Sequence, residues 1–134
     1  MQIDIRARNI RGRQFKIVRT SEELYLEILS ADYTNSYLVR LGVGLKYADS
    51  VITSPITSTG NTLAIGINRA DKSSILEESY VVLLFSFTYN TTVWVKYEYP
   101  TATTDKSRLS QLILDEDNEI IYACGDLNAV YYKG

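Results

Sequence analysis

Apolar and polar residues alternate along much of this chain, which is the pattern of β-strands that bury one side. Gly42 and Gly44 fall inside the longest alternating stretch, residues 37–47, where a bend, a bulge or a close backbone approach is expected. The alternation predicts strands over residues 2–8, 14–20, 37–47, 51–57 and 62–69.

Residues 79–99 give the clearest prediction of a β-hairpin. A three-residue loop at 90–92 sets Phe85 opposite Tyr97, so that the apolar sides of both strands coincide and form core; a shift by one residue would turn every side chain over. Asn90 suits the left-handed conformation that such a loop needs. The predicted core side carries Val81, Leu83, Phe85, Phe87, Tyr89, Val93, Val95, Tyr97 and Tyr99.

The C-terminal part predicts a second hairpin over residues 113–122, with an acidic tip at 115–119, and a last strand at 129–132. Two segments, 22–30 and 107–114, fit either a helix or a strand. Thr20 and Glu23 have capping-box spacing, but Leu24, Leu26 and Ile28 alternate, which favours a strand for the first. The Thr- and Ser-rich residues 53–62 predict an exposed loop.

The composition agrees with this pattern, since 49 of the 134 residues are β-branched or aromatic and such residues favour strands. About eight short strands separated by turns indicate an all-β fold. We expect a single domain over residues 1–134, an antiparallel β-sandwich or barrel with at most one or two short helices.

Several classes of function are excluded by what the sequence lacks. It has no histidine and one cysteine, Cys124, which rules out internal disulfides, Cys/His zinc sites and Ser-His-Asp catalysis. We therefore expect no enzyme, no cofactor and no metal site. The N-terminus has no signal-peptide pattern and no apolar run approaches membrane-spanning length, so the expected location is a reducing cytoplasm.

Basic residues gather near the N-terminus. Residues 1–20 carry a net charge of +5 and the rest of the chain −7, for a total of −2. This basic stretch has three interpretations: a solvated strand face, a docking surface for an acidic partner or the acidic tail of another copy, and a phosphate-binding stripe. The near-neutral total argues against a nucleic-acid partner. The basic interface candidates are Arg6, Arg8, Arg11, Arg13, Lys16 and Arg19.

The acidic tip at residues 115–119 does not match a calcium-binding EF-hand loop. An EF-hand needs Gly at its sixth position and Glu at its twelfth, where this chain has Ile120 and Asp126. A solvated hairpin turn is the better interpretation, with calcium held between loops as the alternative. Paired carboxylates could also serve glycoside hydrolysis, but nothing in the sequence shows which two would face each other.

Trp94 is the most informative single aromatic residue, because the predicted register sets it on the polar side of its strand with Lys96 and Glu98. It is either an interface anchor, a residue covered by a second layer, or a stacking platform for a sugar. Tyrosines near turns and at the C-terminus are further interface candidates: Tyr33, Tyr37, Tyr47, Tyr131 and Tyr132.

The Thr- and Tyr-rich strands, residues 91–100 and the hairpin at 114–121 together resemble small structural proteins of tailed-phage particles. This resemblance implies a capsid-decorating, head–tail connector or tail and fibre component, held by repeated contacts with other protein subunits or with itself as a homo-oligomer. The alternatives are a carbohydrate- or receptor-binding module using Trp94, and a nucleic-acid-binding domain using the basic N-terminal strands.

Overall fold

The computed structural model describes residues 4–8, 14–19, 24–29, 35–42, 48–55, 57–69, 76–100 and 107–132. Within these residues the chain forms eleven β-strands and no helix. All strand pairs are antiparallel and are arranged in three sheets. The prediction of an all-β antiparallel fold is therefore confirmed, and the described strands close into no barrel.

Each sheet is built from strands that follow one another in the sequence. Sheet A, in the order β1-β2-β3-β4, contains β1 (Asp4–Arg8), β2 (Gln14–Arg19), β3 (Leu24–Leu29) and β4 (Ser36–Arg40). Sheet B, in the order β5-β6-β7-β8, contains β5 (Ala48–Thr53), β6 (Thr62–Arg69), β7 (Tyr80–Ser86) and β8 (Thr91–Glu98). Sheet C, in the order β11-β10-β9, contains β9 (Leu109–Asp115), β10 (Ile120–Gly125) and β11 (Leu127–Tyr132).

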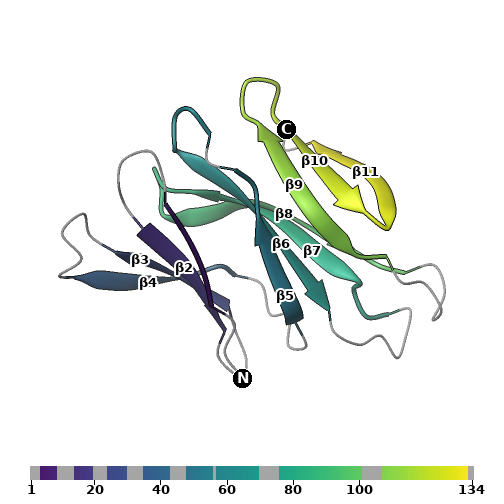
Figure 1. Ribbon diagram of the computed structural model, residues 1–134, viewed down its shortest axis with the longest axis horizontal. Helices are drawn as coiled ribbons and strands as arrows, with labels where there is room; N and C mark the ends of the chain where they lie inside the picture. The colour runs from purple at the N-terminus through teal and green to yellow at the C-terminus, as the bar shows by residue number, and fades with distance from the viewer. Residues whose placement is uncertain are drawn as a thin grey trace.

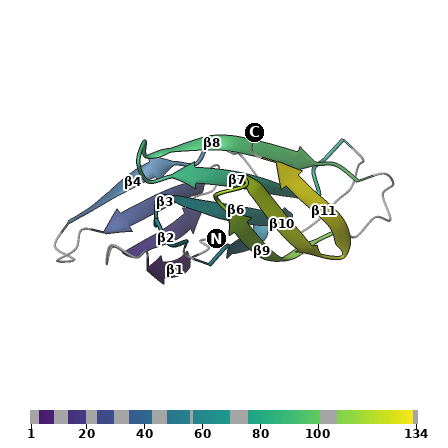
Figure 2. The ribbon, with the colours of Figure 1, turned by 90° about the horizontal axis from the view of Figure 1, so that it is seen from above.

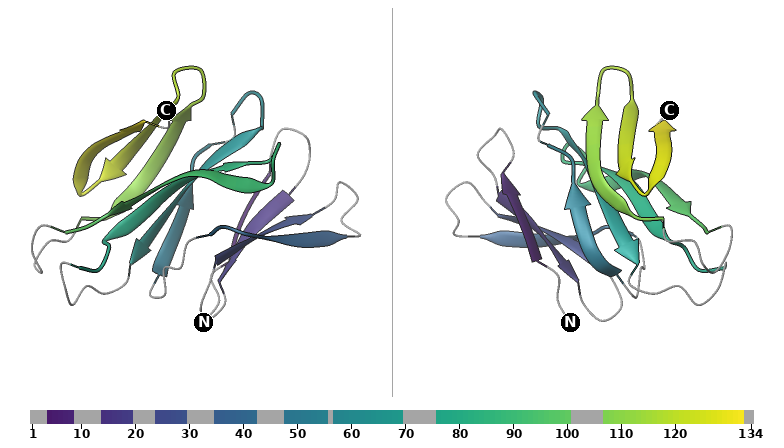
Figure 3. Two further views of the ribbon diagram at one scale, coloured as in Figure 1. Left: turned by 180° about the vertical axis from the view of Figure 1, so that it is seen from behind. Right: turned by 45° about the vertical axis from the view of Figure 1, so that its right-hand side comes forward.

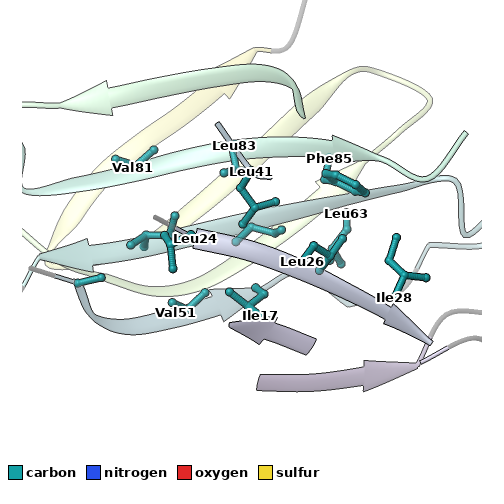
Figure 4. Close-up of a cluster of buried hydrophobic side chains, with 13 residues drawn as sticks. Ile17, Leu24, Leu26, Ile28, Leu41, Val51, Leu63, Val81, Leu83 and Phe85 are labelled. Carbon is teal, nitrogen blue, oxygen red and sulfur yellow. The ribbon is translucent and has the colours of Figure 1, made fainter. Parts of the chain in front are cut away.

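Sheet B lies between the other two sheets, so the fold has three layers (Figures 1 and 3). One core fills the space between sheets A and B, where side chains from β2 and β3 meet those of β5, β6 and β7 (Figure 4). Its fully buried members include Ile17, Leu26, Ile65, Leu83 and Phe85. A second core between sheets B and C contains Ala64, Tyr80, Val82, Leu84, Leu109, Leu112, Ile121 and Ala123.

The two central strands of sheet B are buried on both sides, which is uncommon for an antiparallel sheet. In β6, Leu63, Ile65 and Ile67 face sheet A, whereas Ala64 faces sheet C. Gly66 also lies toward sheet C, where a Cβ atom would come within 2.8 Å of Leu109 Cδ1. A small residue at this position therefore lets sheet C pack closely on the middle of sheet B.

Two predictions about strand limits and register are wrong. The strand predicted over residues 37–47 ends at Arg40. The Leu41 N–H still donates to the carbonyl oxygen of Leu24 in β3, and the chain turns away at Gly42, which has a φ of +76°. The bend expected at this glycine is confirmed, and residues 43–47 lie outside the described part. The loop predicted at 90–92 is a turn over residues 87–90. Phe85 pairs with Thr92 instead of Tyr97.

The apolar residues of the two strands nevertheless lie on the same side of the sheet, as predicted. Over most of the hairpin the observed register differs from the predicted one by an even number of residues, which keeps each side chain on its predicted side. Val81 pairs with Tyr97, and Leu83 pairs with Val95. The register then shifts between Leu84 and Phe85, which makes Val93 the extra residue of a bulge. Asn90 has a φ of 53°, as expected for its place in the turn.

The segments with open assignments are strands: β3 falls within residues 22–30, and β9 covers most of 107–114. The acidic hairpin and the last strand are also confirmed, as β9–β10 and β11. No helix among the described residues is long and apolar enough to cross a membrane.

Candidate functional site

A row of large apolar side chains is exposed along β8 and at Tyr99, which directly follows it. Val93, Val95, Tyr97 and Tyr99 are 45, 40, 38 and 51% exposed; we call these four residues the β8 stripe. Tyr89, in the preceding turn, is also exposed. Apolar side chains that gather on a surface in this way mark contact sites for other molecules.

The β8 stripe is exposed because sheet A stops short of this strand. Val95 and Tyr97 pair with Leu83 and Val81, whose side chains are buried against sheet A. The core between sheets A and B contains no β8 residue among those described. Strand β8 is also the last strand of sheet B, and its outer edge pairs with no described strand (Figure 2).

The two ends of β8 are fixed to the rest of the fold. At its start, the Thr92 hydroxyl donates a hydrogen bond of 2.6 Å to the carbonyl oxygen of Leu41, which follows β4. At its end, the Ser79 N–H donates one of 2.7 Å to the carbonyl oxygen of Glu98. The exposed strand is therefore held in place at both ends.

An ion-paired cluster lies next to the end of β8. The Arg69 guanidinium contacts Glu77 Oε2 and Glu78 Oε1, each at 3.2 Å, and its side chain is almost fully buried. Partial burial, with smaller contributions from Glu78 and Tyr99, raises the pKa of the Tyr97 phenol. Tyr97 therefore stays neutral at physiological pH and presents an uncharged ring and hydroxyl.

Trp94 lies on the opposite side of β8 from Val95 and Tyr97. It pairs with Leu84 and packs, partly buried, against the core between sheets B and C. One interpretation of Trp94 from the sequence was a residue covered by a second layer, and sheet C is such a layer. This position agrees better with a covered residue than with an open stacking platform.

The basic interface candidates fall mainly in sheet A. Arg6 and Arg8 are in β1, with Arg6 paired to Lys16 of β2. Lys16 in turn pairs with Glu27 of β3, and its Nζ lies 3.7 Å from Glu27 Oε2. Arg19 is the last residue of β2, whereas Arg11 and Arg13 lie outside the described residues. Tyr131 and Tyr132 are the last residues of β11, where they pair with Ile121 and Ile120 of β10. The candidates within the described residues therefore lie in strands of the outer two sheets, and none of them belongs to β8.

A pocket of about 310 Å³ separates the Thr/Ser loop from the acidic turn between β9 and β10. Across it, Thr59 Oγ1 donates to the Glu116 carboxylate, 2.9 Å from either oxygen. No group of three or more potential ligands for a metal ion is found among the described residues. The hydrogen bond between Thr59 and Glu116 therefore joins two surface loops. The pocket between these loops is lined by Thr57, Ser58, Thr59, Leu114, Asp115, Glu116 and Asp117.

The acidic turn has its own hydrogen bonds, which predict a pH effect. Asp115 accepts bonds from the side-chain amide of Asn118 at 2.8 Å and from its N–H at 3.2 Å; these lower the pKa of Asp115. A lowered pKa means that this stabilisation is present above the ordinary Asp pKa and is lost as the pH falls through the lowered value. In an NMR titration, Asn118→Ala should raise the pKa of Asp115, and an unchanged pKa would contradict this assignment.

The sequence identified the residues of the β8 stripe but assigned them to the core. Their alternation shows which side of the strand is apolar, and says nothing about whether another sheet covers that side. Comparison with known protein families, with curated proteins and with solved structures gives no match for this chain.

Proposed function

We propose that this chain is a non-enzymatic building block of a larger protein assembly and that it contacts other subunits through the β8 stripe. The observation that supports this is the combination of a strand edge that no described strand pairs with and exposed apolar side chains along the same edge. An edge strand offers unpaired N–H and C=O groups to another chain, and burial of the stripe adds hydrophobic stabilisation. The resemblance to structural proteins of tailed-phage particles suggests a virion as the assembly.

The test compares the mass of the native chain in solution with that of Val95→Asp, by light scattering over a concentration series. We expect the native chain to form a species of more than one subunit and Val95→Asp to remain a monomer, because association would bury an unpaired carboxylate. Ile113→Asp is the matched control, since Ile113 is an equally exposed apolar residue, 44% exposed, on a different sheet. A native chain that stays monomeric, or loss of association in both variants alike, would contradict the proposal.

A further inference from the structure

The outer edge of β8 carries a pattern that is complementary to itself. Because the Glu98 carbonyl bonds to Ser79, just before β7, its backbone groups point toward β7. Backbone groups of successive strand residues point in alternate directions. The N–H and C=O groups of Val95, Tyr97 and Tyr99 therefore point toward the open edge, and Pro100, which has no N–H, does not interrupt this row.

A second copy related by a two-fold axis would pair with this edge in antiparallel orientation. The two copies then present the same surface to each other, as in other two-fold interfaces. Residues of one side meet residues of the same side, so the exposed apolar residues of one copy lie beside those of the other.

A two-fold axis at any of residues 95–98 keeps this match, and charge and backbone shape separate the four positions. An axis at Lys96 sets the two Lys96 ammonium groups against each other, and an axis at Glu98 does the same with the two Glu98 carboxylates, which is unfavourable. An axis at Val95 sets Val93, the extra residue of the bulge, opposite Tyr97, and a bulge disrupts strand pairing. An axis at Tyr97 leaves the bulge outside the paired residues.

The axis at Tyr97 also gives the best side-chain pairs. Lys96 of each copy lies opposite Glu98 of the other, so two pairs of opposite charge form. On the other side of the sheet, Val95 lies opposite Tyr99 of the second copy and the two Tyr97 rings meet, and such aromatic and β-branched cross-strand pairs stabilise sheets. The outward groups of Val95, Tyr97 and Tyr99 provide the hydrogen bonds between the copies.

We infer that two copies of this chain pair through β8 in antiparallel orientation, with the two-fold axis at Tyr97, and join their B sheets into one eight-stranded sheet. This inference rests on the proposed function and names the partner at the β8 stripe as a second copy. Three exposed side chains of the stripe, those of Val95, Tyr97 and Tyr99, each gain a neighbour from the other copy. The bulge at Val93 and the bond from Thr92 to Leu41 lie outside the paired residues and stay unchanged.

The test is a charge exchange measured as the dimer dissociation constant by sedimentation. Lys96→Glu and Glu98→Lys should each weaken the dimer about tenfold, because each sets like charges opposite each other at two places. The double variant Lys96→Glu/Glu98→Lys should restore the native dissociation constant. The two single variants change the net charge in opposite directions, so an effect of net charge alone cannot weaken both.

Hydrogen exchange gives an independent readout of the register. The amides of Val95, Tyr97 and Tyr99 should exchange more slowly at concentrations where the dimer forms, while the amide of Asp117, in the exposed turn, should not change. Association that persists unchanged in both single variants overturns the register at Tyr97 and leaves the proposed function standing. A native chain that is monomeric at every concentration overturns both.

Discussion

Asn68→Ala should lower the free energy of unfolding by about 3 kcal/mol, because it leaves buried backbone groups unpaired. Asn68 is 1% exposed and lies toward sheet C. Its amide accepts a bond of 2.8 Å from the Leu109 N–H and donates one of 2.9 Å to the Leu109 carbonyl oxygen. This side chain thus holds the start of β9 on sheet B in the way a neighbouring strand would.

Ser50→Ala is the control for this prediction. Ser50 Oγ accepts bonds from the Asn68 amide at 3.0 Å and from Arg108 at 3.3 Å, and Ser50 is only partly buried. Its removal should cost about 1 kcal/mol, since water can replace part of what is lost. Chemical denaturation measures both values, and equal losses in the two variants would show that the Leu109 contacts do not carry the stabilisation.

Gly125→Ala should destabilise the protein by at least about 3 kcal/mol, because it combines backbone strain with a collision between backbones. Gly125 has a φ of +152° and lies where the register between β9 and β10 shifts. A Cβ atom there would lie 2.1 Å from the carbonyl oxygen of Arg108, which also accepts a bond from the Asp126 N–H. Relief of this contact requires β9 and β10 to separate.

Gly42→Ala is the control that separates the backbone strain from the collision with a neighbouring backbone. Gly42 also has a positive φ, +76°, but a Cβ atom there would meet nothing within 4 Å. This variant should therefore lose only the backbone term of about 1 kcal/mol. If thermal or chemical unfolding gave the same loss for both glycines, the contact with Arg108 would contribute nothing.

The sequence predicted the fold class well because strand alternation is a local property. The acidic hairpin, the left-handed Asn90 and the bend at Gly42 each depend on a few neighbouring residues. The register of β7 and β8 depends on more than the apolar pattern, because a shift by two residues keeps the same sides together. The turn over residues 87–90 and the bulge at Val93 fix the register between β7 and β8.

The third layer could not be predicted in this way. Val82 and Leu84 alternate with the residues that face sheet A, so β7 is apolar from Tyr80 to Phe85. The predicted core took in only one side of this strand, and the apolar run by itself does not show what covers the second side. The partner is sheet C, whose strands come from residues 109–132. Packing between segments far apart in the sequence leaves no local pattern.

The same reasoning explains the β8 stripe. Val95 and Tyr97 have the pattern of core residues, and their exposure follows from where sheet A ends, which is a property of the assembled layers. An apolar strand side that the fold leaves open is what an interface between subunits requires. Residues that sequence assigns to the core and that structure exposes are thus useful markers of a contact surface.

The most direct measurement is the mass of the native chain in solution over a concentration series. The account predicts a rise from the 15.2 kDa of a single chain toward twice that value as the concentration increases. A mass of 15.2 kDa at every concentration would contradict it.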